Sequence, residues 1–384
     1  MNKQYLLTPG PVAVPERIQR AMLQPMIHHR LSPEFAGILD EGVQGLQWAF
    51  QTSHPVHVLT GSGTMGMEAA VCNFASRGDK VICIGGGEFG DRWAAICRAF
   101  GLETLVLEVE WGTAVDPQAL KALLDRHADV RAVFATASES STGVMHPVQE
   151  LAALCRGREA LCIVDAISAV GACDLPMDGW GIDVLVGASQ KAFMLPPGLA
   201  FIAVSPKGWE RHRAANLPRF YLDLSKSRTA LEKDHTTPWT PAISLIYGLQ
   251  EAIRMMREEG LHEVFRRHLA LADATRKACV AMGCDLFGTV PSPTVTAVKV
   301  PKGIDGNAIT DRLRTHYGIV LAGGIFSMRG KIFRLAHLGH FSTFDTLMAI
   351  GGLEMTLSDL GHQFELGAGV RVVEQLLRAS RDPR

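Results

Sequence analysis

The fold is constrained most strongly by an alternation of short apolar runs with amphipathic stretches, which begins near residue 56. Each run is apolar at nearly every position, so both faces of the corresponding strand are expected to be buried, as in a parallel sheet covered by helices on both sides. Most of the stretches between the runs have the periodicity of amphipathic helices. We therefore predict an α/β fold with a mostly parallel seven-stranded sheet, whose strands span residues 56–60, 81–85, 104–109, 132–137, 161–166, 184–188 and 199–204.

The pattern changes after residue 205, which indicates a second unit. Residues 206–241 are polar and rich in Arg, Lys and Pro, and the next 40 or so residues favour long helices. A smaller β/α region follows, with strands expected near 294–300, 319–322 and 331–338 and a helix over 307–316. We predict an N-terminal arm (residues 1–14), a large domain (15–260) and a small C-terminal α/β domain (261–384), which a chain of 384 residues is long enough to build.

Composition excludes several classes of protein. The net charge of −1 gives no overall attraction to nucleic acid or anionic membranes, and no apolar run is long enough to span a bilayer. The eight cysteines lie mostly in apolar stretches without a Cys-x-x-Cys pair, which is typical of reduced, buried cysteines. The N-terminus lacks the apolar core of a signal peptide. We expect a cytoplasmic protein that binds neither nucleic acid nor membranes.

A glycine-rich turn, Gly61-x-Gly63-x-x-Gly66, follows the first strand and opens a helix. Glycines let the backbone approach an anion, free N–H groups at the helix N-terminus attract it, and Ser62 and Thr64 add hydroxyl donors, so the turn suits a phosphate. The same spacing also fits a dinucleotide-binding turn or a simple helix cap. The dinucleotide interpretation lacks the acidic residue expected at the end of the second strand, which instead runs into glycines.

Two charged residues follow strands of the same sheet, at the edge where open α/β sheets bind ligands. Asp165 ends the apolar run 161–164, and Lys191 follows the strand 184–188 and precedes Pro196-Pro197-Gly198. Alone, the aspartate could cap a helix and the lysine could be solvated. Together with the glycine-rich turn they match what pyridoxal 5'-phosphate requires: a lysine for the Schiff base, a carboxylate for the ring nitrogen and a cradle for the phosphate.

Several strings resemble class V aminotransferases, which are pyridoxal-phosphate transferases of fold type I, and within them the alanine/serine–glyoxylate (serine–pyruvate) group. The likeness runs from Thr8-Pro9-Gly10-Pro11 to about residue 355. It is carried by Ser62-Gly63-Thr64, Glu139-Ser140-Ser141-Thr142-Gly143, Val164-Asp165, Ser189-Gln190-Lys191-Ala192 with Pro196-Pro197-Gly198, and Phe333-Arg334-Leu335.

The resemblance implies a role for each matching residue. Lys191 is the Schiff-base lysine and Asp165 is the partner of the pyridine nitrogen. Phe89 stacks on the cofactor ring, although a core phenylalanine is the alternative. The residues implied around the phosphate are Ser62, Gly63, Thr64 and Gln190.

The resemblance also implies a substrate site and a second subunit. Arg334 grips the substrate carboxylate, Gly10 and Ser140 line the substrate, and Ser140 reaches the ring substituents. Thr240 reaches the phosphate from the neighbouring subunit of a homodimer, with Thr236 and Thr237 as alternatives. No metal ion is expected, because His28-His29 and His337-x-x-His340 lack further ligands at a suitable spacing.

The implied activity is a ping-pong transfer of the amino group of alanine or serine to glyoxylate or pyruvate. Small donors are favoured because no second arginine for a side-chain carboxylate is evident, although Arg30 could serve as one and admit aspartate. Relatives that act on 2-aminoethylphosphonate or ureidoglycine share most of these motifs. The alternative from another class is a non-covalent nucleotide-binding protein that uses the glycine-rich turn.

Overall fold

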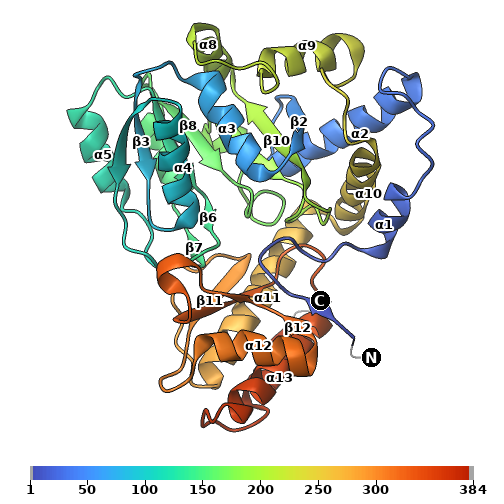
Figure 1. Ribbon diagram of the computed structural model, residues 1–384, viewed down its shortest axis with the longest axis vertical. Helices are drawn as coiled ribbons and strands as arrows, with labels where there is room; N and C mark the ends of the chain where they lie inside the picture. Colours follow the sequence, from blue (N-terminus) through green and yellow to red (C-terminus); the bar gives the residue numbers. More distant parts are fainter. Residues whose placement is uncertain (1–2, 380–384) are drawn as a thin grey trace.

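The computed structural model describes residues 3–379, which form a large portion above a smaller one (Figure 1). The large portion contains a seven-stranded sheet in the order β2-β10-β9-β8-β5-β3-β4. Of these strands β10 runs antiparallel to its neighbours and the other neighbouring pairs are parallel, so the predicted sheet is confirmed. The strands are β2 (Val56–Gly61), β3 (Lys80–Ile84), β4 (Glu103–Leu107), β5 (Ala132–Thr136), β8 (Leu161–Asp165), β9 (Val184–Ala188) and β10 (Gly198–Val204).

Both faces of this sheet are buried, which explains its continuously apolar strands. Within β5, Val133 and Ala135 face one core while Ala132 and Phe134 face the other, because successive side chains alternate between the faces. The first core includes side chains of α2 (Pro33–Phe50), α5 (Pro117–Arg126), α6 (Val148–Cys155) and α10 (Ile243–Glu259). The second includes side chains of α3 (Gly63–Phe74) and α4 (Glu88–Ala99).

The small portion has its own core around the antiparallel sheet β11-β14-β13. The strands are β11 (Val295–Lys299), β13 (Ala322–Gly323) and β14 (Ile332–Ala336), and the helices are α11 (Leu261–Ala281), α12 (Gly306–Tyr317), α13 (Thr343–Asp359) and α14 (Ala368–Ala379). The helix pair α10 and α11 breaks at Gly260, whose φ is +87°. The division of the chain at residue 260 remains our proposal.

The strand expected over 319–322 consists of two short strands that pair with different partners. β12 (Ile319–Val320) pairs in parallel with β1 (Tyr5–Leu6), whereas β13 joins β14. The N-terminal arm therefore crosses to the small portion, where β1 lies beside β12 (Figure 1). Leu7 continues this contact and is buried in the core of the small portion.

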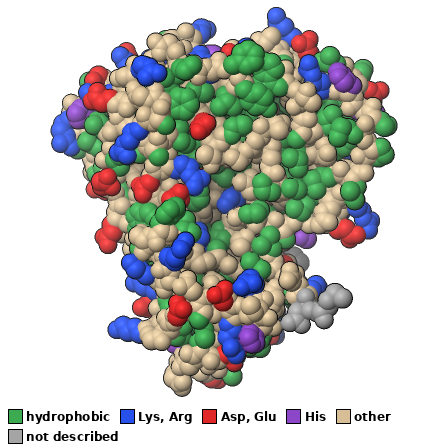
Figure 2. All heavy atoms as spheres, viewed as in Figure 1, with side chains coloured by type: hydrophobic (Ala, Val, Ile, Leu, Met, Phe, Trp, Pro, Cys, Tyr) green, Lys and Arg blue, Asp and Glu red, His purple; other side chains and the backbone are tan. Residues whose placement is uncertain are grey.

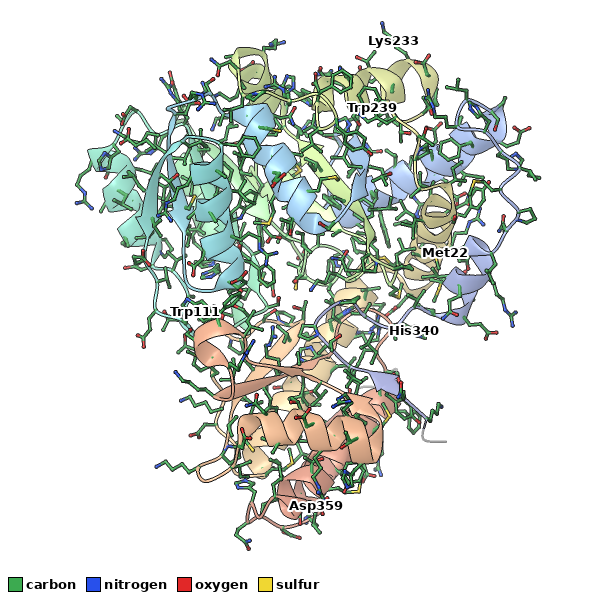
Figure 3. All side chains as sticks on the ribbon, viewed as in Figure 1. Met22, Trp111, Lys233, Trp239, His340 and Asp359 are labelled. Carbon is green, nitrogen blue, oxygen red and sulfur yellow. The ribbon has the colours of Figure 1, made fainter. Side chains whose placement is uncertain are left out.

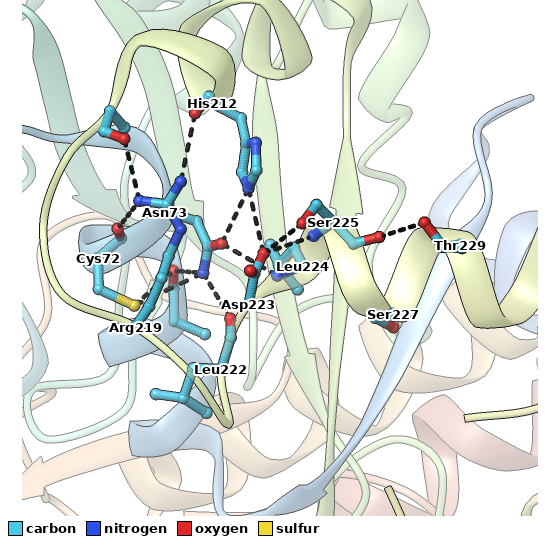
Figure 4. Close-up of polar contacts among 12 residues, drawn as sticks. Cys72, Asn73, His212, Arg219, Leu222, Asp223, Leu224, Ser225, Ser227 and Thr229 are labelled. Atoms are coloured by element: carbon cyan, nitrogen blue, oxygen red, sulfur yellow. Dashed lines mark hydrogen bonds and ion pairs between the residues drawn. The ribbon is translucent and has the colours of Figure 1, made fainter. Parts of the chain in front are cut away.

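The polar stretch 206–241 contains two helices, α8 (Pro206–Ala214) and α9 (Leu224–Asp234), which the sequence pattern did not indicate. Asn73, on the last turn of α3, holds this stretch through hydrogen bonds to its backbone, as Figure 4 shows. Its side-chain amide donates to the Leu222 carbonyl at 2.7 Å and accepts from the Leu224 backbone N–H at 3.0 Å. The helix that follows the glycine-rich turn is thus anchored at its far end.

The remaining short elements connect these units. They are α1 (Glu16–Met22), β6 (Ser138–Glu139), β7 (Val144–Met145), α7 (Met177–Trp180) and the 3₁₀ turn η1 (Phe326–Met328). None of the helices in the described part of the chain has the length and apolar character needed to cross a membrane.

Candidate active site

The glycine-rich turn, Asp165 and the segment leading to Lys191 meet at one edge of the large sheet. β8 and β9 are parallel neighbours, so the residues that follow them emerge at the same edge. Gly63 packs so tightly here that a Cβ atom on it would lie 2.5 Å from Ile167 and 3.2 Å from the Ala188 Cβ. A side chain at position 63 would therefore have to push Ile167 aside, and glycine lets the start of α3 lie against the ends of β8 and β9.

Asp165 is a buried carboxylate, with 3% of its surface exposed. It accepts a hydrogen bond from the Ile167 backbone N–H at 2.8 Å. Burial raises the pKa of Asp165 to about 6, while this hydrogen bond and the positive charges of Lys191 and Arg92 lower it. The carboxylate is therefore mostly ionised at neutral pH and available to a cationic ring nitrogen.

Lys191 is also buried, and its amine faces the N-terminal arm. Its Nζ donates to the Pro9 carbonyl oxygen at 2.5 Å. Gly10 has a φ of +132°, and a Cβ on it would lie 2.3 Å from that Nζ, so a side chain at position 10 would displace the amine. Burial lowers the pKa of Lys191 to about 8, although the Asp165 charge opposes this shift. A neutral, nucleophilic amine is thus accessible near neutral pH.

The turn before α3 offers unused donors. Ser62 is the N-cap residue of α3, yet its exposed side chain makes no capping hydrogen bond. Gln190 has a buried side-chain oxygen without a hydrogen-bond partner within residues 3–379. Turned about its last bond, that amide presents NH₂ donors at the same position. Helix N–H groups, hydroxyls and an amide of this kind fit a phosphate group, and Asp165 and Lys191 fit the ring of pyridoxal phosphate.

Arg334 enters the site from β14 of the small portion. Its Nε and Nη2 donate to the Gly323 carbonyl oxygen at 3.0 and 2.8 Å, and its Nη1 donates to the Ser140 carbonyl oxygen at 2.8 Å. A guanidinium has five N–H groups, so one on each terminal nitrogen is left over. Burial lowers the pKa of Arg334 to about 10, so the group stays cationic at neutral pH. This pair of N–H groups suits a carboxylate.

Phe89 lies in the first turn of α4. Its backbone is held by Glu139, a residue to which the sequence assigned no role. The Glu139 carboxylate accepts hydrogen bonds from the backbone N–H groups of Phe89 and Gly90, each at 3.0 Å. Burial raises the pKa of Glu139 to about 7, whereas bonds from Ser141 and Gly90 lower it. The position of Glu139, just after the fourth strand that the sequence predicts (132–137), was the available signal.

Arg92 is the second residue that the sequence analysis left unassigned. Its Nη1 donates to the Thr64 hydroxyl at 3.0 Å, and its Nη2 donates to Glu88 at 2.9 Å. The i,i+4 spacing of Glu88 and Arg92 could have indicated the ion pair, but not the contact with Thr64 on another helix. The structure thus places an arginine at the wall of the expected phosphate site.

Thr240 does not join the other site residues through its side chain, which is exposed. The Ala242 backbone N–H donates to the Thr60 hydroxyl at 3.2 Å, so this segment passes the start of the glycine-rich turn of its own chain. Thr236 and Thr237 are buried and bond to Arg30: the Thr236 hydroxyl donates to the Arg30 carbonyl, and the Arg30 guanidinium donates to the Thr237 carbonyl. The role predicted for Thr240 stays a prediction.

The surface around this segment is apolar. Trp239 stacks on the exposed Phe220 and Tyr221, with ring centres 5.0 and 6.0 Å apart. Hydrophobic side chains gather on the upper part of the face in Figure 2, where Figure 3 labels Trp239. Further exposed hydrophobic side chains precede α2, namely Leu23, Met26, Ile27 and Leu31.

No cluster of three or more His, Cys, Asp or Glu side chains suited to a metal ion occurs within the described range. The features that do converge are a buried lysine, a buried aspartate at the end of a neighbouring strand and a donor-rich helix N-terminus. In a mostly parallel sheet covered on both sides, they define a pyridoxal-phosphate enzyme of fold type I.

Comparison with known proteins identifies the family. The model of the family described as aminotransferase class-V matches residues 26–335, so this chain belongs to the class V aminotransferases and its cofactor is pyridoxal phosphate. The chain is 42% identical over 382 residues to the "Soluble hydrogenase, small subunit" of Synechococcus sp. (98% of this chain and 99% of the relative). It is 36% identical over 388 residues to the L-aspartate–glyoxylate aminotransferase of Paracoccus denitrificans (98% and 97%).

A solved structure agrees closely. The ureidoglycine-glyoxylate aminotransferase of Bacillus subtilis superimposes with a TM-score of 0.94 at 31% identity, covering 98% of this chain and 99% of that one. The predictions of fold type I, of an aminotransferase and of the cofactor are therefore confirmed.

Proposed function

We propose that this aminotransferase moves the amino group of a small amino acid, alanine or serine, to glyoxylate or pyruvate in two half-reactions at one site. The observation that carries the proposal is the buried guanidinium of Arg334, whose two unused N–H groups match one substrate carboxylate. Glyoxylate as acceptor is supported by the names of the Paracoccus and Bacillus relatives.

In this proposal each residue has one task. Arg334 binds the substrate carboxylate and fixes the orientation of the α-carbon. The Lys191 amine, once free, takes the proton from that carbon and later returns a proton, and its lowered pKa suits both directions. Asp165 would keep the ring nitrogen of the bound cofactor protonated. Pyridoxal phosphate, when bound, supplies the aldehyde and the electron-withdrawing ring that make the α-proton acidic.

The other site residues position these groups. We propose that Ser62, Gly63, Thr64 and Gln190 bind the phosphate and that Phe89 stacks on the ring. Gly10 and Ser140 line the substrate in the same proposal, and the close approach of Gly10 to the Lys191 amine supports this.

Aspartate is the second candidate donor. The Paracoccus relative is named for aspartate, and Arg30 provides a cation beside the Thr236–Thr240 segment. The Arg30 guanidinium donates to the Thr237 carbonyl, which leaves other N–H groups for a side-chain carboxylate. 2-Aminoethylphosphonate and ureidoglycine are further candidate donors for the same site.

A half-reaction screen decides among the donors. Purified, cofactor-loaded protein is mixed separately with alanine, serine, aspartate, glutamate and 2-aminoethylphosphonate, and the loss of its visible absorbance band is followed without any acceptor. Alanine and serine should remove the band at the lowest concentrations. A loss with aspartate alone would overturn the donor assignment and leave the cofactor assignment intact.

We further propose a homodimer with an active site shared between subunits. The apolar surface formed by Phe220, Tyr221 and Trp239, together with the exposed hydrophobic residues that precede α2, supports this, because monomers rarely expose patches of this kind. If Thr240 completes the partner's phosphate site, a mixture of refolded Lys191→Ala and Thr240→Val chains should be more active, at limiting pyridoxal phosphate, than the mean of the two variants measured separately. Absence of recovery in mixed dimers would contradict the shared site.

A cytoplasmic location remains part of the proposal. The eight cysteines are free and buried, as expected for a reducing compartment.

A further inference from the structure

Arg92, to which no role has yet been assigned, connects two walls of the expected cofactor site. The Arg92 guanidinium donates to the Thr64 hydroxyl at 3.0 Å, and its central carbon lies 4.8 Å from the centre of the Phe89 ring. Thr64 belongs to α3 and Phe89 to α4, so Arg92 links the expected phosphate cradle to the expected ring-stacking residue. The guanidinium is partly buried, with 31% of the side chain exposed.

The bond to Thr64 directs the hydroxyl proton. A threonine hydroxyl has one proton to donate and can also accept hydrogen bonds. Because Arg92 donates to Oγ1, the Thr64 proton points away from the guanidinium and is left for an acceptor. A phosphate oxygen is an acceptor of this kind, and the nearby guanidinium charge strengthens the attraction.

The contact of the Arg92 guanidinium with Phe89 restrains one face of the phenylalanine ring. A cation over the face of an aromatic ring is attracted by the ring's quadrupole. The backbone of Phe89 is held independently by Glu139, so both ends of the residue are restrained. Glu88 accepts a hydrogen bond from the other terminal nitrogen of Arg92, which sets the orientation of the guanidinium plane.

We propose that Arg92 is a positioning residue of the cofactor site, which turns the Thr64 hydroxyl toward the phosphate and holds Phe89 against the ring. The inference rests on the proposed roles of Thr64 and Phe89. Arg92 also contributes to keeping Asp165 ionised, because its charge lowers the pKa of that carboxyl.

The test compares two ligands on purified apoprotein. Equilibrium dissociation constants are measured for pyridoxal 5'-phosphate and for pyridoxal, which lacks the phosphate, with wild type, Arg92→Met and Arg92→Lys. Loss of a hydrogen bond to a charged phosphate oxygen, here the bond from the oriented Thr64 hydroxyl, corresponds to about 10-fold to 100-fold weaker binding. Arg92→Met should therefore weaken the binding of pyridoxal phosphate by up to this factor. The affinity for pyridoxal should fall by a smaller factor. Arg92→Lys should recover part of the affinity for pyridoxal phosphate that Arg92→Met loses.

Arg98→Met is the matched control, because Arg98 is exposed on the last turn of the same helix. It should leave both constants unchanged. Equal weakening of both ligands by Arg92→Met would overturn the link to the phosphate, and no weakening of either would overturn the whole inference. If wild-type apoprotein itself fails to bind pyridoxal phosphate, the proposed cofactor site fails rather than the role of Arg92.

A double-mutant comparison isolates the path through Thr64. If Arg92 acts by orienting that hydroxyl, the Arg92→Met/Thr64→Val chain should bind pyridoxal phosphate more tightly than the two single losses multiplied together predict. Fully multiplicative losses would contradict the orienting role. Arg92→Gln, which keeps a donor without the charge, provides a second folded variant if Arg92→Met is unstable.

Discussion

Replacing Arg334 with glutamine removes the group that we expect to bind the substrate carboxylate. In the structure three N–H groups of Arg334 are committed to the carbonyls of Gly323 and Ser140, and two are left for the substrate. Two charge-assisted hydrogen bonds at about 1.5–3 kcal/mol each amount to about 3–6 kcal/mol, or roughly 10²-fold to 10⁴-fold in kcat/KM. Arg334→Lys keeps the charge but not the paired N–H groups of the guanidinium, so the fall in kcat/KM should be intermediate.

The assay separates carboxylate binding from general damage. Rates of the first half-reaction are measured with alanine and with ethylamine, which has the same amine but no carboxylate, and their ratio is compared between variants. The ratio of the alanine rate to the ethylamine rate should fall sharply in Arg334→Gln, because only alanine has a carboxylate for the guanidinium to bind. Arg329→Gln, an exposed arginine just before β14, should leave the ratio unchanged.

A preserved ratio in a folded Arg334→Gln protein would refute the reasoning. It would mean that the two unused N–H groups do not meet the substrate. A fall in both rates by the same factor would point instead to loss of the contacts that join β14 to Ser140.

Three further predictions follow from the buried charges and the tight contacts. Asp165→Asn should make the apoprotein more stable at pH 7.5, by up to about 3 kcal/mol, because burial raises the pKa of Asp165 to about 6 and the ionised form is penalised above that pH. The gain should shrink as pH falls through 6 toward 4 in urea unfolding, and a less stable variant at pH 7.5 would contradict it. Cofactor uptake by the apoprotein should accelerate as pH rises through about 8, where Lys191 loses its proton, and a flat rate profile would oppose this. Gly10→Ala should slow covalent attachment of the cofactor while allowing non-covalent binding, since the new Cβ would lie 2.3 Å from the lysine amine and force it to move; normal attachment kinetics would contradict that contact.

The sequence predicts the large sheet well for a physical reason. Strands buried on both faces are apolar at nearly every position, and apolar runs of 5–7 residues are too short to form buried helices. The reversed direction of β10 leaves no mark in that pattern. The helices α8 and α9 were missed because their stretch is polar and only a few side chains, such as Leu224 and His212, are buried.

Part of the candidate site could likewise be predicted from the sequence, and part could not. Asp165 and Lys191 follow apolar strands, so their positions at one edge could be inferred from chain order alone. The contacts of Glu139 and Arg92 join elements that pack only in three dimensions, and no local spacing encodes them. The split of residues 319–323 between β12 and β13 depends on pairing with the distant N-terminal arm.

The most direct measurement fixes the cofactor to its lysine. Protein purified with pyridoxal phosphate is treated with borohydride, which makes the carbon–nitrogen link permanent, then digested and analysed by mass spectrometry. The added mass should lie on the peptide that contains Lys191 and be absent from a Lys191→Ala chain. A modified peptide from elsewhere in the protein, or none at all, would contradict the account.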